Sequence, residues 1–193
     1  MTGTWSCVPW LRVWAALLLV LASLPARAGT GDIAGVRSTN AAIREMLDDG
    51  AWESPTFRGL VRAIVAHKGI VYVEDGVCLH GVHACLVMNV TPASGYRILQ
   101  IVIDRQGVMA HRRRLDVIAT IGHELCHAME VLADRSITSA AAIFQFYAGK
   151  VATANPSFET RAAIATGLKV RSELGHGGHG DTFVWQQVAL DVR

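Results

Sequence analysis

The sequence predicts an α+β domain in which a small antiparallel sheet packs against a long apolar helix and further helices. Apolar residues repeat at helical spacing in the first and last thirds of the chain, and short β-branched stretches separated by turn residues lie between them. Helices and strands therefore occupy separate parts of the chain, as is typical of this class. The length of 193 residues suggests a single domain.

Each predicted element is bounded by capping or turn residues. Ser54-Pro55 is the clearest helix start, because serine caps a helix and proline suits its first position, and Gly50 is expected to end the helix before it. Turns at Asp75-Gly76 and Pro92–Gly95 separate three β-branched stretches, of which the last two form a predicted hairpin. The expected helices cover residues 39–49, 55–68, 115–132, 139–151 and 155–175, and the expected strands cover residues 70–74, 85–91 and 96–104.

Residues 1–28 have the features of a secretory signal peptide. Arg12 provides a short positive region, Val13–Leu24 is apolar but too short to cross a bilayer comfortably, and Ala26-Arg27-Ala28 matches an A-x-A cleavage site. We therefore expect a soluble exported protein, periplasmic or secreted, with one domain at residues 29–193.

The mature chain is close to neutral. Residues 1–28 contain Arg12, Arg27 and no acidic residue, so 16 basic and 16 acidic residues remain after cleavage. This balance argues against nucleic acid or an anionic membrane surface as a partner. We expect a monomer that binds neither.

The helix predicted over residues 115–132 carries the sequence His123-Glu124-Leu125-Cys126-His127. Positions i and i+4 share one helix face, so His123 and His127 can direct imidazole nitrogens at one zinc ion. Glu124 is next to this pair, where its carboxylate can accept a proton from a metal-bound water. Such a site needs at least one more protein ligand and an open position for the water. Asp116 can cap this helix or lie in its first turn.

The motif H-E-x-x-H resembles that of the zincin metallopeptidases. The glycine and third histidine that follow it in metzincins are replaced here by Glu130 and Ala133, and no G-T-x-x-D stretch of the aspzincin type is present. The gluzincin pattern, in which a later helix supplies a glutamate, is matched best by Glu159. The resemblance covers roughly residues 115–175, and its specific part is the first half.

This resemblance implies a minimal zincin-like fold with one catalytic Zn²⁺, held by His123, His127 and Glu159, and with Glu124 as the general base. It also implies an edge strand lining the cleft, a peptide or protein substrate, and the activity of a zinc metallopeptidase. Two alternatives remain open. One is an exported module that binds zinc without catalysis, and the other is an inactive zincin-like scaffold that binds a partner.

Other residues are candidates for parts of the same site. Glu173 and the histidines His176 and His179 of a glycine-rich segment are alternative ligands, and Glu130 or Asp134 can hydrogen-bond a ligand histidine. The side chains considered as groups that polarise a substrate carbonyl are Tyr96, His111 and Tyr147.

Three cysteines remain after signal cleavage. Cys78 and Cys85 are expected to form a disulfide in an oxidising compartment, with Cys126 unpaired and buried on the motif helix. Together with His80 and His83, the first two cysteines could instead form a small structural metal site.

Overall fold

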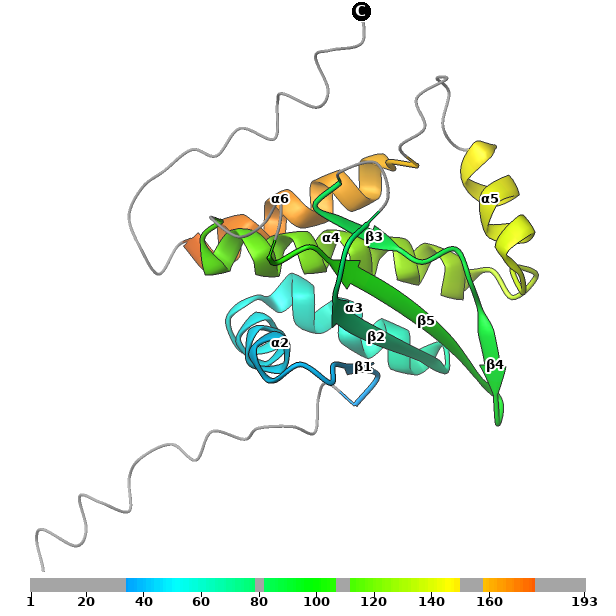
Figure 1. Ribbon diagram of the computed structural model, residues 1–193, viewed down its shortest axis with the longest axis horizontal. Helices are drawn as coiled ribbons and strands as arrows, with labels where there is room; N and C mark the ends of the chain where they lie inside the picture. Colours follow the sequence, from blue (N-terminus) through cyan, green and yellow to red (C-terminus); the bar gives the residue numbers. More distant parts are fainter. Residues whose placement is uncertain (1–33, 79–81, 107–111, 150–157, 176–193) are drawn as a thin grey trace, which may run out of the picture.

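The computed structural model describes residues 34–78, 82–106, 112–149 and 158–175, which form five helices and a five-stranded sheet (Figure 1). Their order is β1 (Val36–Arg37), α2 (Ala41–Glu53), α3 (Pro55–Ala66), β2 (Gly69–Asp75), β3 (Ala84–Leu86), β4 (Thr91–Ala93), β5 (Tyr96–Ile103), α4 (Arg114–Ala133), α5 (Ala140–Ala148) and α6 (Arg161–Gly175). The predicted α+β class is confirmed. The expected signal peptide lies outside the described residues, and within them no helix combines the length and apolar character needed to cross a bilayer.

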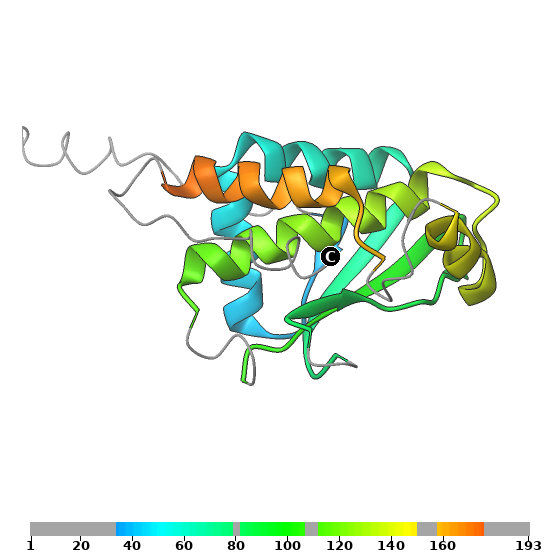
Figure 2. The ribbon, with the colours of Figure 1, turned by 90° about the horizontal axis from the view of Figure 1, so that it is seen from above.

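Helices cover one face of the sheet. α2, α3 and α4 contact the strands, and α6 packs onto α3 and α4. Figure 2 shows α3, α4 and α6 running side by side next to the sheet. α4 therefore has neighbours on several sides, and its segment 116–128 is buried without interruption. Asp116 was expected either to cap this helix or to lie in its first turn, and it lies in the first turn of α4.

The sheet is mixed, which corrects the prediction of an antiparallel sheet. Its strand order is β1-β2-β5-β3, with β4 also paired to β5. β2 is parallel to both β1 and β5, whereas β3 and β4 run antiparallel to β5. A hairpin does join β4 and β5, through a turn in which Ser94 and Gly95 both have positive φ. The segment 76–95 is long enough to return the chain to the starting end of the sheet, so β2 and β5 can pair in parallel.

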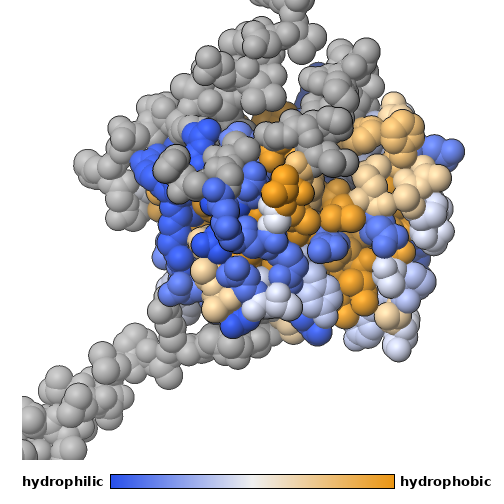
Figure 3. Space-filling view, viewed as in Figure 1, coloured by the Kyte–Doolittle hydropathy of each residue, from blue (hydrophilic) through white to orange (hydrophobic). Residues whose placement is uncertain are grey.

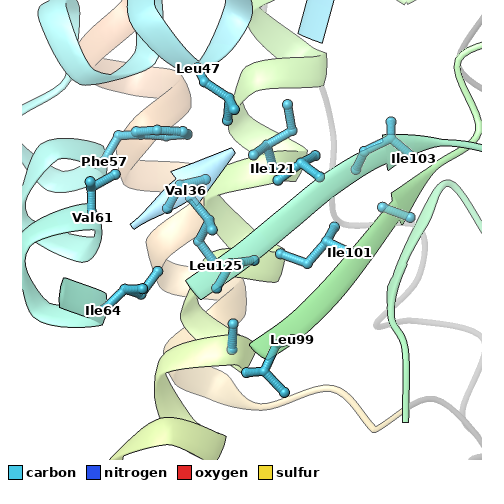
Figure 4. Packing of buried hydrophobic residues seen from close by; sticks show 14 of the residues in the cluster. Val36, Leu47, Phe57, Val61, Ile64, Leu99, Ile101, Ile103, Ile121 and Leu125 are labelled. Atoms are coloured by element: carbon cyan, nitrogen blue, oxygen red, sulfur yellow. The ribbon is translucent and has the colours of Figure 1, made fainter. Parts of the chain in front are cut away.

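Alternate residues of the central strands point into the core. The inward residues of β5 are Leu99, Ile101 and Ile103, and they belong to one buried cluster with Ile121 and Leu125 of α4 (Figure 4). Full burial of such a side chain contributes about 1.5–3 kcal/mol. This apolar contact holds one face of α4 against the sheet and thereby determines which residues of α4 lie on the face that points away from it.

Gly50 lies inside α2 and does not end it, contrary to the prediction. The helix continues to Glu53. A Cβ added at Gly50 would lie 2.9 Å from Ile118 Cγ2 and 3.1 Å from Phe57 Cδ2. The glycine therefore permits α2 to approach α4 and α3 closely, a requirement that the local sequence does not reveal.

Other boundaries differ at element ends. Asn40 caps α2 through its side chain, so this helix begins at Ala41 and not at residue 39 as expected. The predicted strand 85–91 divides into β3 and β4, and α6 begins only at Arg161. Ser54 caps α3 with Pro55 in its first turn, as predicted. Residues 150–157, where one helix end and one helix start were expected, lie outside the described residues.

Arg97 of β5 holds the C-terminal end of α4. Its guanidinium donates hydrogen bonds to the backbone carbonyls of Leu132 and Asp134, the second at 2.8 Å. The last carbonyls of a helix have no partner within it, and a cation near them interacts favourably with the helix dipole. These hydrogen bonds fix the long motif helix to the sheet in addition to its apolar contacts.

Glu173, near the end of α6, binds the start of α3. Its carboxylate accepts hydrogen bonds from the hydroxyls of Ser54 and Thr56, the latter at 2.7 Å, and from the Thr56 N–H at 3.0 Å. Burial acts to raise the pKa of Glu173, but these hydrogen bonds outweigh it and leave the pKa below its ordinary value. The contact joins the end of α6 to the cap of α3.

Glu173→Gln should lower the free energy of unfolding by about 1 kcal/mol at pH 7, because hydrogen bonds to a partly exposed carboxylate become neutral ones. A carboxylate with a lowered folded-state pKa stabilises the fold above its unfolded-state pKa, ordinarily 4.5, and this contribution is lost as the pH falls through the folded-state value. Urea unfolding should therefore show a difference between wild type and variant that shrinks below about pH 4. Glu53→Gln, at an exposed glutamate, is the control. An equal difference at neutral and acidic pH would contradict the prediction.

Cys78 and Cys85 form a disulfide, as predicted, and Cys126 is a free, buried cysteine. Sulfur atoms joined in a disulfide are not available as thiolate ligands, so the alternative of a structural metal site at these cysteines does not fit. Burial raises the pKa of the Cys126 thiol, which keeps it protonated and unreactive at neutral pH.

Residues 29–193 exported through an oxidising compartment should therefore contain one titratable thiol per chain, and it should react only after denaturation. The measurement is a thiol count with a chromogenic disulfide reagent, without reductant, in native buffer and in guanidinium chloride. Cys126→Ser should reduce the denatured count to zero. Three thiols in freshly exported protein would show that the disulfide is not formed.

Candidate metal centre

Three polar side chains of the motif are buried in α4. His123, Glu124 and His127 are 4%, 7% and 6% exposed, respectively, within a helix enclosed by the sheet, α3 and α6. Burial of imidazole and carboxylate groups is unfavourable unless they find polar partners or a metal ion. The surrounding residues supply several such partners.

Glu159 brings its carboxylate to both histidines. Its Oε2 lies 3.0 Å from His123 Nε2 and 3.9 Å from His127 Nε2. One potential ligand atom from each of the three residues lies within 4.8 Å of the others. Ligands bound at about 2.0–2.2 Å around a tetrahedral zinc ion are roughly 3.3–3.6 Å apart, so small shifts would let these atoms surround one ion. The three residues predicted as metal ligands are thus brought together.

The charges at the site also suit a divalent cation. Burial acts to raise the pKa of Glu159, but hydrogen bonds with His123 and His127 outweigh it and lower that pKa well below its ordinary value. Burial acts to lower the pKa of His127, whereas hydrogen bonds with Glu130 and Glu159 raise it to about 9. The carboxylates of Glu130 and Glu159 therefore favour positive charge at His127, an electrostatic environment that also attracts a cation.

Glu159 lies just before α6, which corrects the prediction that it belongs to the helix. Close packing of α6 on α4 nevertheless brings it to the histidines. A Cβ added at Gly167 would lie 3.2 Å from His123 Cβ, and one added at Gly122 would lie 3.0 Å from Val170 Cγ2. These two glycines, one on each helix, let the helix that follows Glu159 lie directly against the motif.

Two contacts orient His127. Its Nδ1 lies 3.1 Å from Glu130 Oε2, and a proton on Nδ1 leaves Nε2 available for a metal ion. Tyr147 of α5 donates its hydroxyl proton to the backbone carbonyl of His127 at 3.0 Å. Of the two acids considered as partners of a ligand histidine, Glu130 has this position, whereas Asp134 accepts hydrogen bonds from Ser136.

Glu124 lies beside the potential ligands without belonging to them. Its Oε1 is 3.9 Å from His123 Nε2, and its carboxylate is hydrogen-bonded by the backbone of Leu86. Burial raises the pKa of Glu124, although the two histidines and this hydrogen bond oppose the shift. A carboxylate with a raised pKa is better suited to accept a proton and release it again near neutral pH.

β3 lies next to α4 at the end of the strand order. The Asp104 N–H donates to the His83 carbonyl and the Val87 N–H donates to the Gln100 carbonyl, which pairs alternate residues of this segment with β5. The backbone groups of Leu86, between them, therefore point away from β5. β3 is thus an edge strand of the sheet, and Leu86 directs its N–H to Glu124.

Aromatic rings connect the site to α5. The ring of Tyr147 lies edge-on to His127 with centroids 5.4 Å apart, Phe158 lies 5.7 Å from Tyr147, and Phe144 lies 5.4 Å from Phe158. Phe144 is 56% exposed, and Figure 3 shows apolar surface in the region of α5. These rings hold Phe158, the neighbour of Glu159, against α5, and Tyr147 connects α5 to the motif helix.

The remaining candidates do not take the roles considered for them. Glu173 binds the start of α3, and it does not belong to the group of potential metal ligands that contains His123 and His127. Tyr147 is buried with its hydroxyl on a backbone carbonyl. Tyr96 begins β5 at the hairpin turn, beside the arginine that binds the C-terminal end of α4. Neither tyrosine fits the role of polarising a substrate carbonyl. His111, His176 and His179 lie outside the described residues.

Two contacts of the site were missed from the sequence. Leu86 binds Glu124 through its backbone, and the hydroxyl of Thr160 donates to Glu130 Oε1 at 2.7 Å. Thr160 could have been found as a capping residue ahead of a helical pattern. Nothing in the sequence near Leu86 marks its contact with the motif, because that contact depends on the position of the sheet edge.

Comparison with protein-family models, with curated proteins and with solved structures found no match to this chain. The resemblance to zincins therefore depends on the motif and on the geometry described above.

Glu159→Gln should weaken binding of Zn²⁺ or Co²⁺ by more than the roughly 100-fold that loss of an outer hydrogen-bond partner can cost, because an anionic ligand is replaced by a neutral one of the same size. The measurement is competition with a chromogenic chelator. Glu173→Gln is the matched control at the other end of α6 and should retain wild-type affinity. The assignment of Glu159 would be wrong if the Glu173 variant lost the metal and the Glu159 variant kept it.

Proposed function

We propose that this protein is an exported zinc-dependent hydrolase, and specifically a peptidase, with His123, His127 and Glu159 as the zinc ligands. The observation that carries this proposal is the position of Glu124. The three proposed ligands would by themselves complete the protein part of a catalytic zinc site, and a fourth polar group is buried beside them. A buried carboxylate adjacent to a metal site but outside its ligand set suits a general base.

Zinc bound by these residues would supply a Lewis acid that polarises a carbonyl and lowers the pKa of a water molecule towards about 7. Glu124 then acts as the base that takes the proton of the attacking water and returns it to the leaving amine. The Leu86 N–H hydrogen bond holds the Glu124 carboxylate at one position through both proton transfers. Glu130 keeps the His127 ring in the orientation that leaves Nε2 for the metal.

The edge strand β3 supports an extended peptide as the substrate. The backbone groups of Ala84 and Leu86 point away from β5, as the pairing on either side of Leu86 requires, and of these groups the Leu86 N–H binds Glu124. An extended chain can add to such an edge through main-chain hydrogen bonds, which require no particular side chain in the substrate. A peptide placed there would run alongside α4 and past Glu124.

Export is supported by the signal-like residues 1–28 and by the disulfide, which is stable in an oxidising compartment. The alternatives are an exported module that binds zinc without catalysis and an inactive scaffold that binds a partner. They differ from the hydrolase in one respect that can be measured. In both of them, loss of the Glu124 carboxylate has no catalytic consequence.

Glu124→Gln should retain zinc and thermal stability but lose peptide hydrolysis by about 100- to 10,000-fold, since the amide keeps the shape of the side chain and is a far weaker base. The assay is cleavage of a broad peptide library by residues 29–193, followed by mass spectrometry. Cleavage by wild type should stop with a zinc chelator and return with added zinc, and His127→Ala serves as the metal-free control.

Wild type that is fully loaded with zinc and cleaves nothing across the library would favour the non-catalytic alternatives. A Glu124→Gln variant that cleaves as fast as wild type would refute the role given to this residue.

A further inference from the structure

Thr160 makes two hydrogen bonds through a single hydroxyl. Its Oγ1 donates to Glu130 Oε1 at 2.7 Å and accepts from the Ala163 N–H at 3.2 Å. Its backbone carbonyl accepts from the Ile164 N–H at 3.1 Å. A threonine hydroxyl has one proton to donate and lone pairs to accept, so both contacts are satisfied together. Thr160 is thus the cap of α6 and, at the same time, a partner of the motif helix.

Glu130 extends this contact to the metal site. One carboxylate oxygen binds Thr160, and the other lies 3.1 Å from His127 Nδ1. Two contacts on different oxygens fix the plane of the carboxylate. A continuous chain of hydrogen bonds therefore runs from His127 through Glu130 to Thr160, and one peptide bond separates Thr160 from Glu159.

Glu159 needs such a constraint because it has no helical backbone of its own. It lies before the first turn of α6, and its side chain is 40% exposed. On one side, Phe158 is held by ring contacts, which are only weakly directional. On the other side, Thr160 is held by a directional hydrogen bond to the same glutamate that orients His127.

We infer that Thr160 is a positioning residue, which sets the carboxylate of Glu159 against His127 through the shared partner Glu130. The inference rests on the metal site proposed above and adds a residue that ties its separate elements together. His123 and His127 come from one helix, whose geometry fixes their spacing. The distance from them to Glu159 depends on tertiary contacts, and the Thr160–Glu130 hydrogen bond is one of these, a single residue from the ligand.

The test measures zinc affinity by chelator competition in five variants of residues 29–193. Thr160→Val keeps the branched shape but cannot donate or accept, and it should weaken zinc binding by about 10-fold or more. Thr160→Ser keeps the hydroxyl and should bind like wild type. Ser139→Ala is the matched control, because Ser139 caps α5 through the same kind of bond, from the Ala142 N–H at 3.2 Å. It should lose stability but no zinc affinity.

The last two variants, Glu159→Gln alone and combined with Thr160→Val, separate positioning of the ligand from general loss of structure. In Glu159→Gln the anionic ligand is already gone, so adding Thr160→Val should cause no further loss of affinity. An equal loss in both backgrounds would mean that Thr160 acts on the fold and not through Glu159, and it would overturn the inference.

Wild-type affinity in Thr160→Val, or a loss in Thr160→Ser, would also overturn it while leaving the zinc site intact. If Thr160→Val does not fold, Glu130→Ala removes the acceptor of the Thr160 hydroxyl without touching the helix cap, and unchanged zinc affinity in that variant overturns the inference. Wild type that binds no zinc would refute the proposed site and this inference together, a result that differs from all the others.

Discussion

Burial of the motif in the middle of α4 is the constraint on which the rest of the structure depends. Two imidazoles and a carboxylate cannot be removed from water without partners, since each unpaired group would cost several kcal/mol. The sheet supplies the Leu86 N–H on one side, and the segment before α6 supplies Glu159 on the other. Because these partners belong to elements far apart in sequence, the site can form only when the elements around α4 have packed in this arrangement.

The close packing of α6 on α4 is what allows Glu159 to take part. Gly122 and Gly167 remove the side chains that would otherwise separate the two helices. Asp116 near the start of α4 binds Arg171 of α6 at 2.7 Å, in a largely buried ion pair. Breaking such a pair on one side leaves an uncompensated buried charge, so it opposes any sliding of α6 along α4.

Much of this could be predicted from local sequence, and the rest could not for identifiable reasons. The spacing of His123 and His127 is a property of a helix, and Ser54-Pro55 is a local signal, so both were predicted correctly. The parallel pairing of β2 with β5 depends on the end of the sheet to which the connection over residues 76–95 brings the chain, and no local sequence pattern encodes this. Gly50 was misplaced because a glycine that permits helix contact looks the same in sequence as one that ends a helix.

The two glutamates near the ends of α6 show most clearly where sequence reasoning stops. Glu159 and Glu173 are the same residue type within one helical unit, yet one lies against two histidines and the other against the cap of α3. What distinguishes them is the direction of α6 over α3 and α4. That direction is fixed by contacts along its length: Thr160 with Glu130 at its start and Arg171 with Asp116 towards its end. A carboxylate that directly precedes a helix held at both ends has a defined position before any metal binds, and that preorganisation lowers the entropy lost on binding.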